Sequence, residues 1–468
     1  MFRQTLTKEW LDAKRQGQLW WLCLIASLLL LLACTTGWQS YQSYQSDAYD
    51  VAQQEQMRWL NQGEKGPHSA AHYGIYVIKP ASPLVALDDG LQAYQGNVVR
   101  LEAHTRNDGM FRTVQDNLPM ARFGSLTPAF VLQVLLPLLI LLIGYPMFAS
   151  EREQGTLKQL LASGVEPLQL FAAKCCVLFA IAATLLLPVI VYLLFIQFEQ
   201  SESAKLVYRS AGFFVVYISY VALWSIITIA ISCLLKSSRR SLIVLLTIWA
   251  LSTLLIPKLA MNYSTSVYPL DSNQAFQNRL KREVYTDHRE MAFERFEQSL
   301  LQKYAVSSTS ELPFDFAGAR LQFGEQYADA IFDRLFGERL EQLQLQTDSY
   351  FLASLLSPMI AVQSLSMAFS ASDFHHHQHF LARAELHRRM MQRMLNHNQR
   401  DHAHKSEGHY VANLSLWQQI PKFEYHPPAF TDLAHHYRVN WFSLILWLTA
   451  SLFLGTFAVR KLTKEPLR

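Results

Sequence analysis

Residues 123–150 read FGSLTPAFVLQVLLPLLILLIGYPMFAS and contain no Asp, Glu, Lys or Arg. A helix needs about 20 mostly apolar residues to cross a bilayer, and each charge at its centre costs about 2.5–3.5 kcal/mol. This stretch is therefore long and apolar enough to form a transmembrane helix. It decides the fold class, because the same pattern recurs along the chain.

The chain has 468 residues, of which 51% are hydrophobic and only 17% charged. We predict an α-helical membrane protein with six spans. The fifth window ends at Pro257, but its helix can continue to Met261, since the Lys258 side chain can reach the interface. Cys34-Thr35-Thr36-Gly37 is a poor signal-peptidase site, so the first window indicates a retained anchor. The uncharged windows are residues 16–46, 123–150, 175–198, 210–235, 241–257 and 439–459.

The basic residues predict the orientation. With six spans both termini lie on one side, where the sequence carries 14 Lys and Arg against 6 Asp and Glu. The other side carries 27 basic and 31 acidic residues. The positive-inside rule then places both termini in the cytoplasm of a bacterial inner membrane and the large segments in the periplasm. The net charge of +4 reflects this topology and does not indicate a nucleic-acid partner.

These windows predict a division of the chain into membrane and soluble segments. We expect a cytoplasmic amphipathic N-terminal helix carrying Phe2, Leu6 and Trp10, a short cytoplasmic helix between spans 2 and 3 (called the coupling helix below), a cytoplasmic turn between spans 4 and 5, and a cytoplasmic tail. The expected boundaries, in order, are 1–18 (N-terminal helix), 19–38 (span 1), 39–125 (periplasmic lobe 1), 126–149 (span 2), 150–168 (coupling helix), 169–198 (span 3), 199–209 (short periplasmic loop), 210–235 (span 4), 236–240 (turn), 241–261 (span 5), 262–438 (periplasmic lobe 2), 439–459 (span 6) and 460–468 (tail).

The two exported segments differ in pattern. Lobe 1 begins as a helix to Asn61 and then contains strand-like stretches at Tyr73–Ile78 and Asn97–Glu102, separated by Gly and Pro. Lobe 2 shows helical periodicity over residues 276–304, 321–343 and 380–394. We expect a two-part, mainly helical periplasmic domain with some β structure. All five cysteines lie in or beside predicted spans, so no disulfide framework supports it.

The coupling segment begins with charge and continues as an apolar stripe. Leu157, Leu160, Leu161, Val165 and Leu168 fall on one face of a helix. Glu151 and Glu153 precede this helix, where acidic groups favour its positive end, and Gly155 and Thr156 provide a break and an N-cap. A short helix with a charged edge is suited to contact another protein, although a loop that only reverses the chain would satisfy the same spacing.

Residues 150–157, SEREQGTL, followed by Leu160-Leu161 and Lys174, resemble the pattern of ABC-2 type permeases, the membrane subunits of type V ABC transporters. Ala173 replaces the Gly that usually precedes this Lys. The resemblance implies that the segment couples the permease to an ATPase subunit. The implied coupling residues are Glu151, Arg152, Glu153, Gly155, Thr156, Leu157, Leu160 and Leu161.

A second resemblance is to a subgroup of these permeases with large periplasmic inserts of unassigned role. It rests on residues 67–74 (PHSAAHYG), 87–90 (LDDG), 101–104 (LEAH) and 122–124 (RFG). The family forms two ATP sites between paired nucleotide-binding subunits. The resemblance therefore implies two such subunits and a second permease subunit, giving a homodimer or a related heterodimer.

The chain has no energy source of its own. It lacks the G-x-x-x-x-G-K-[ST] phosphate loop, and the predicted spans lack mid-membrane charges that ion-coupled carriers use. We find no signature of a catalytic site, such as G-x-S-x-G. ATP and Mg²⁺ are therefore expected in a partner subunit, and the chain is not expected to be an enzyme.

A histidine-rich stretch suggests metal binding as an alternative function. His375, His376, His377 and His379 lie in DFHHHQH, where the i, i+4 pair can bind Zn or Cu on one helical face. His68 and His72 share that spacing. Ordinary solvated or packing histidines would give the same pattern. Otherwise we expect no cofactor.

We conclude that the sequence predicts the permease of an ATP-driven exporter or extractor. One alternative is a mechanotransmission subunit that moves nothing across the membrane and acts on a periplasmic partner. The other is a periplasmic metal-binding membrane protein. The sequence does not identify the cargo.

Overall fold

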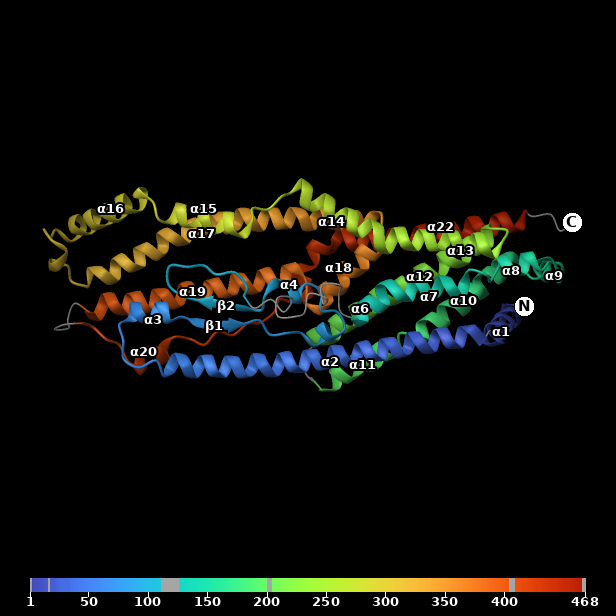
Figure 1. Ribbon diagram of the computed structural model, residues 1–468, viewed down its shortest axis with the longest axis horizontal. Helices are drawn as coiled ribbons and strands as arrows, with labels where there is room; N and C mark the ends of the chain where they lie inside the picture. The colour runs from blue at the N-terminus through green and yellow to red at the C-terminus, as the bar shows by residue number, and fades with distance from the viewer. Residues whose placement is uncertain (1, 16, 111–125, 200–203, 404–408, 465–468) are drawn as a thin grey trace.

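The computed structural model describes residues 2–15, 17–110, 126–199, 204–403 and 409–464. The stretch 122–124, part of the loop 199–209, His404 and the last residues of the tail lie outside this description. The molecule is elongated (Figure 1), with both ends of the chain at one end of the long axis and α3, α16, α19 and α20 toward the other.

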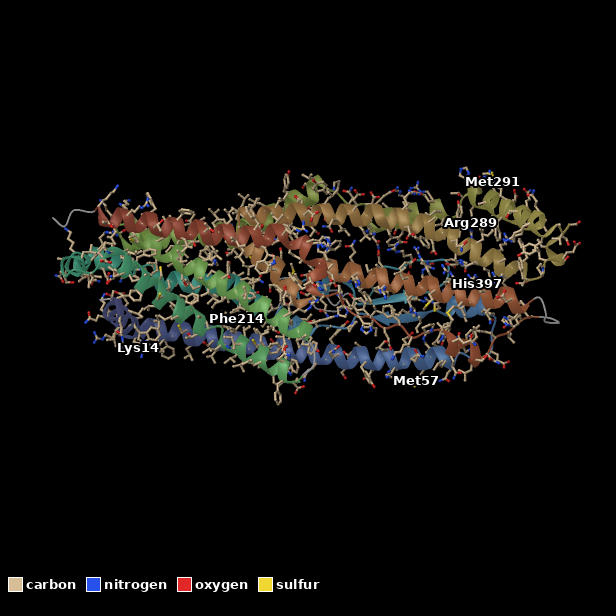
Figure 2. The ribbon with its side chains drawn as sticks, turned by 180° about the vertical axis from the view of Figure 1, so that it is seen from behind. Lys14, Met57, Phe214, Arg289, Met291 and His397 are labelled. Carbon is tan, nitrogen blue, oxygen red and sulfur yellow. The ribbon has the colours of Figure 1, made fainter. Side chains whose placement is uncertain are left out.

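Six helical segments of the described chain are long and apolar enough to cross a membrane. This confirms the predicted helical membrane fold. The first belongs to α2, one continuous helix over Gly17–Leu60, which at 1.5 Å per residue extends about 66 Å. It therefore runs well beyond the bilayer thickness, and Figure 2 places Lys14 and Met57 at opposite ends of its course. The six segments are Leu19–Leu60, Pro128–Glu153, Pro167–Thr184, Ala204–Leu234, Ser238–Val267 and Phe430–Thr463.

Prolines divide several of these segments. The third apolar window forms two helices, α10 (Pro167–Thr184) and α11 (Leu187–Glu199), rather than one continuous helix. Pro188 has no amide hydrogen to donate to the preceding turn, which explains the interruption. In the second and fifth segments a π-helical turn, η3 or η4, precedes the proline-containing helix and accommodates it. The membrane elements are α6 (Pro128–Phe130), η3 (Val131–Leu135), α7 (Leu136–Gly144), α12 (Ala204–Leu234), α13 (Ser238–Ala250), η4 (Leu251–Leu255), α14 (Ile256–Val267) and α22 (Arg438–Thr463).

Residues outside the candidate spans are mainly helical, as predicted. The two expected strands form: β1 (Ile75–Ile78) pairs antiparallel with β2 (Val98–Leu101), with Ile75 opposite Leu101. The other elements are α3 (Pro67–Tyr73), η1 (Pro83–Ala86), α4 (Gln92–Gln95), α15 (Asn273–Val284), α16 (Asp287–Tyr304), η5 (Thr309–Glu311), α17 (Phe316–Leu352), η6 (Ala353–Leu355), α18 (Pro358–Ser370), α19 (Phe374–His402) and α20 (Leu414–Gln419), while α21 (Phe430–Leu433) and η8 (Ala434–Tyr437) begin the sixth candidate span.

The two large extramembrane segments contribute residues to a common hydrophobic cluster, and the second segment also has a cluster of its own between α15 and α17. Trp59, Val77 and Leu101 from the first segment pack with Phe380 and Trp417 from the second. A backbone bridge also joins Lys65 to Ala412. The end of α2 is therefore held inside a domain built from both segments.

Helix α18 was not predicted from the sequence. Of its 13 residues 11 are buried, so it shows no amphipathic period. It packs on α12 at Gly212, where a β-carbon would lie 2.2 Å from the Phe369 ring. A helix buried on all sides thus connects the membrane segments to the rest of the molecule.

Candidate functional site

The predicted coupling segment forms two short helices, α8 (Ala149–Glu153) and α9 (Thr156–Ala162), at the end of the molecule that holds both chain ends (Figure 1). Gly155 separates them with a left-handed φ of 78°, a conformation that disfavours other residues. Gly155 is also the N-cap of α9. The expected cap at Thr156 is wrong: its hydroxyl donates to the Glu151 carbonyl at 3.2 Å.

The leucine stripe of this segment packs inward. Leu157 is buried, and Leu160, Leu161 and Val165 are partly buried against the main core. Leu168 departs from the prediction, because it lies on α10 and is 60% exposed. The apolar face therefore fixes α9 against the spans and leaves its other face open.

Two charged residues of α8 contact the turn between α12 and α13. Arg152 Nη1 donates to the Leu235 carbonyl at 2.9 Å. Glu153 accepts hydrogen bonds from the backbone N–H and the hydroxyl of Ser238, at 3.0 and 2.7 Å. These groups therefore tie the segment to the start of α13.

The third charged residue, Glu151, belongs to a buried set of four charges that we call the α1 ion cluster: Lys8, Glu9, Glu151 and Lys174. Lys174 Nζ lies 2.7 Å from Glu9 and 3.0 Å from Glu151, and its side chain is only 1% exposed. Lys8 Nζ lies 2.7 Å from Glu151 and 2.8 Å from Glu9. These contacts join α1 (Phe2–Arg15) to α8 and α10, and Lys8 also pairs with the half-exposed Asp12 of α1 at 3.1 Å. Because of these contacts, the pKa of Lys8 is raised despite its partial burial.

Helix α1 packs against the rest of the chain through one face and exposes its aromatic residues. Its buried residues are Thr5, Glu9 and Ala13, whereas Phe2 and Trp10 are exposed. Leu6 is only partly buried. The exposed aromatic side chains suit a membrane surface, and the polar face carries the ion cluster.

The outward face of the α8–α9 segment is small and polar. We call it the α9 face, made of Gln154, Lys158, Gln159, Ala162 and Ser163, all of which are exposed. The implied coupling residues Glu151, Arg152, Leu157, Leu160 and Leu161 instead contact their own chain. The sequence spacing predicted the helical stripe of this segment, but it did not distinguish the residues that contact the rest of the chain from those that are exposed.

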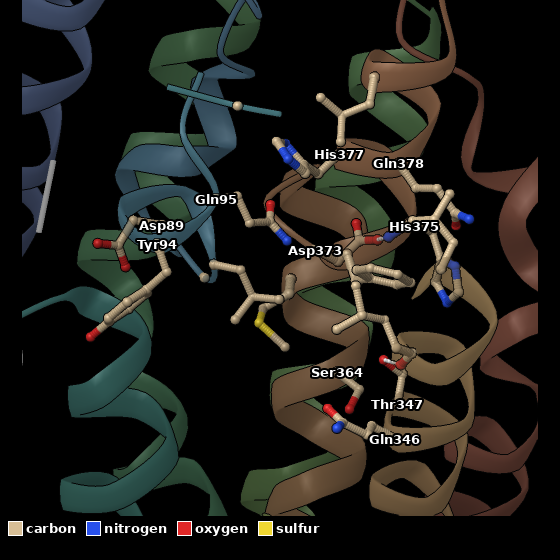
Figure 3. A pocket seen from close by; sticks show the side chains of 18 of the residues that line it. Asp89, Tyr94, Gln95, Gln346, Thr347, Ser364, Asp373, His375, His377 and Gln378 are labelled. Carbon is tan, nitrogen blue, oxygen red and sulfur yellow. Dashed lines mark hydrogen bonds between the residues drawn. The ribbon is translucent and has the colours of Figure 1, made fainter. Parts of the chain in front are cut away.

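A cavity of about 800 Å³ lies where the spans meet the extramembrane helices. Figure 3 shows Asp89 and Tyr94 on one side and His375 and Gln378 on the other. Its lining also includes Gln133 from the second candidate span. The volume falls within the range of about 300–1,000 Å³ that is typical of small-molecule sites.

A polar network connects the spans to this cavity. Ser366 on α18 donates to the Asp88 carboxylate, which also accepts from the Gly90 N–H at 3.1 Å. Tyr217 on α12 bonds to Ser366 at 2.8 Å and accepts from Gln133 Nε2 at 2.9 Å. The network therefore joins α12, α18 and the segment after η1.

Asp88 gives this network a pH dependence. Burial raises the pKa of the carboxyl to about 7, with the neighbouring Asp89 adding to the rise and the hydrogen bond from Ser366 opposing it. Between about pH 4 and 7 the folded protein therefore holds a proton that the unfolded chain releases, so stability falls as pH rises through this window. Asp88→Asn should flatten this slope and raise stability at pH 8 by roughly 1–3 kcal/mol. Thermal unfolding from pH 4 to 8 measures it.

An exposed carboxyl provides the control for that experiment. Asp271→Asn alters an exposed residue just before α15 and should leave the pH slope unchanged. If Asp88→Asn retained the wild-type slope, or lost stability at pH 8, the proton would not reside on Asp88.

The histidine run lies at the start of α19. Asp373 caps this helix by accepting from the His375 and His376 N–H groups at 2.8 and 3.2 Å. The Asp373 carboxylate also bonds to His376 Nδ1, and Arg209 Nη2 donates to His376 Nε2 at 2.8 Å. Since Arg only donates and a carboxylate only accepts, His376 carries its proton on Nδ1 and has no ring nitrogen left for a metal.

The other members of the run point to different neighbours. The His375 ring stacks on His436 with 3.8 Å between centroids, and burial lowers the pKa of His375 to about 4. His379 Nδ1 lies 3.1 Å from the Tyr425 hydroxyl. Within the described residues, this run does not form a group of three or more metal-binding side chains, whereas His68, His72 and His104 do. A metal site at His375–His379 stays an untested prediction that this packing does not favour.

Two regions of the chain match known protein-family models. Residues 72–275 match the family model described as ABC-2 family transporter protein. Residues 274–426 match a domain of unknown function (DUF3526). No curated protein matches the chain.

Proposed function

Since residues 72–275 make this chain a member of the ABC-2 family of transporter proteins, we propose that it is the permease subunit of an ATP-driven exporter or extractor. Such a permease is a multi-pass membrane subunit that works with separate ABC ATPase subunits. The proposed orientation places α8, α9 and both chain ends in the cytoplasm of a bacterial inner membrane, in keeping with the excess of Lys and Arg at that end. The domain shared by the two extramembrane segments then lies in the periplasm.

The observation that carries the proposal is the α8–α9 segment. Its apolar face and three charged side chains bind it to the spans, while the α9 face remains exposed. A force applied to that face reaches α10 through Lys174 and α13 through Ser238. We propose that an ATPase subunit docks there, and that ATP and Mg²⁺ bind in that subunit.

We further propose two ATPase subunits and a second permease subunit, identical or related. Large apolar side chains are exposed along the spans, including Trp21, Leu28 and Phe453. Such a surface needs lipid or another apolar partner. A dimer would place two α9 faces beside a pair of nucleotide-binding subunits.

Mechanotransmission is the second candidate function, and α2 favours it. A single helix runs from the span into the shared extramembrane core, where Trp59 Nε1 donates to the Trp417 carbonyl at 3.1 Å. Movement of the first span would therefore reshape the outer domain directly, without anything crossing the membrane. The cavity of about 800 Å³ favours transport of a small molecule instead.

A bulky substitution on the α9 face tests the docking proposal. Ala162→Trp places a large ring on an exposed helix position, so folding should be unaffected while stimulation of the partner ATPase falls at least ~10-fold, equivalent to about 1.4 kcal/mol. ATP hydrolysis by the reconstituted complex is the measurement.

The matched control is Ala275→Trp, an exposed alanine on α15 in the extramembrane part, which should keep full stimulation. Equal stimulation in Ala162→Trp and the wild type would remove α9 from the coupling interface. Substrate-dependent ATPase activity in vesicles, with or without movement of that substrate across the bilayer, would separate transport from mechanotransmission.

A further inference from the structure

Three histidines meet on the surface of the extramembrane domain, next to α19 and remote from both chain ends (Figure 1). His68 and His72 lie one turn apart on α3, and their Nε2 atoms are 3.2 Å apart. His104 lies in the turn after β2 with a left-handed φ of 58°. One ligand nitrogen from each ring lies within 4.8 Å of the other two.

These separations match a metal site. At the usual Zn–N distance of 2.0–2.1 Å, tetrahedral geometry places two ligand nitrogens about 3.3 Å apart. The His68–His72 distance is already close to this value. The ring centroids of His104 lie 5.2 and 5.3 Å from those of His68 and His72, so small side-chain rotations would complete the set.

A buried carboxylate orients His104 from behind. Glu325 on α17 is 3% exposed, and its Oε1 lies 2.8 Å from both the His104 Nδ1 and the His104 backbone N–H. This contact directs the opposite nitrogen, Nε2, toward His68 and His72. Metal-binding histidines usually have such a carboxylate or carbonyl on their second nitrogen.

The carboxylate itself is held in place by a cation. Arg388 Nη1 lies 2.9 Å from the other oxygen of Glu325.

His68 also has a ring nitrogen that no protein group uses. Its Nδ1 is buried without a hydrogen-bond partner within the described residues.

We propose that His68, His72 and His104 bind one transition-metal ion of the Zn²⁺ class, with Glu325 as the residue that positions His104. Three neutral imidazoles without thiolate suit Zn²⁺, and Cu²⁺ and Ni²⁺ share this preference. Since His72 is exposed, a fourth position stays open to water or to a group from another molecule. The ion would fix α3, the turn after β2 and α17 to one another. This site is independent of the ATPase interface.

Zinc binding by the full chain, purified in detergent without a histidine tag and stripped with EDTA, tests the site. Titration with ZnCl₂ against a chromophoric chelator should give one ion per chain. His72→Gln and His104→Gln should each weaken binding at least ~100-fold, and Glu325→Gln about 10–100-fold. Replacing Zn²⁺ with Co²⁺ provides a second readout, since the visible absorption of a tetrahedral Co²⁺ site should be lost in His72→Gln.

Variants elsewhere distinguish this site from the histidine run. His379→Gln should bind Zn²⁺ like the wild type, and metal-free His72→Gln should unfold at the wild-type temperature because its ring is exposed. Absence of stoichiometric binding would overturn the proposal. So would binding that survives His72→Gln and is lost in His379→Gln.

Discussion

Replacing Lys174 with Met should lower the stability of the membrane part by about 3–5 kcal/mol, because the change leaves Glu9 and Glu151 buried with a single cation, Lys8. Lys174 is 1% exposed and Glu9 is 3% exposed, so water cannot replace the cation at the Glu9 carboxylate. Thermal unfolding in detergent measures the loss. Hydrogen exchange should show α1 opening first, since Glu9 is its charged contact to α10.

Two further variants make this result specific. Lys422→Met removes an exposed charge from a loop of the extramembrane part and should change stability by less than ~0.5 kcal/mol. Adding Glu9→Gln to Lys174→Met removes the buried carboxylate that lost its Lys174 partner and should recover part of the loss. If the double variant were less stable than Lys174→Met alone, uncompensated buried charge would not explain the effect.

The spans could be predicted because bilayer insertion depends on composition over about 20 residues, and this composition can be read directly from the sequence. The interruption between Thr184 and Leu187 was not predicted, although Pro188 marks its place. Helix α18 was also missed. It is buried on every side by α12 and α22, and such a helix carries no periodic signal.

The candidate site could likewise be predicted only in part from the sequence. Glycine and leucine spacing located the α8–α9 segment, but the roles of its charges depend on Glu9, Leu235 and Ser238, which are distant in sequence. The i, i+4 spacing is the same in the His68–His72 pair and the His375–His379 pair, so the sequence indicated both as candidate metal sites. In the folded chain His104 lies beside His68 and His72, whereas both ring nitrogens of His376 are hydrogen-bonded, one to Asp373 and the other to Arg209. Neither contact can be read from the sequence spacing.

Arg388→Met should destabilise the extramembrane domain by about 3–5 kcal/mol, because Arg388 is the shared partner of three acidic side chains. Its guanidinium contacts Asp329, lies 2.9 Å from Glu325 and lies 2.8 Å from Glu385. Burial already raises the pKa of Asp329, so without the cation its ionised form becomes more costly. Hydrogen exchange along α17 and α19 measures the loss, with α12 as the internal reference.

The sign of the pH dependence makes this prediction specific. Without Arg388 the pKa of Asp329 rises further above its ordinary value, so the folded variant holds a proton that its unfolded chain releases, and its stability should fall further as pH rises from 5 to 8. Arg388→Lys should rescue only part of the loss, because an ammonium cannot contact three carboxylates in the guanidinium's planar geometry. Arg383→Met, an exposed position on the same helix, should match the wild type. A loss in Arg388→Met that was equal at pH 5 and pH 8 would indicate lost packing of the side chain rather than uncompensated charge.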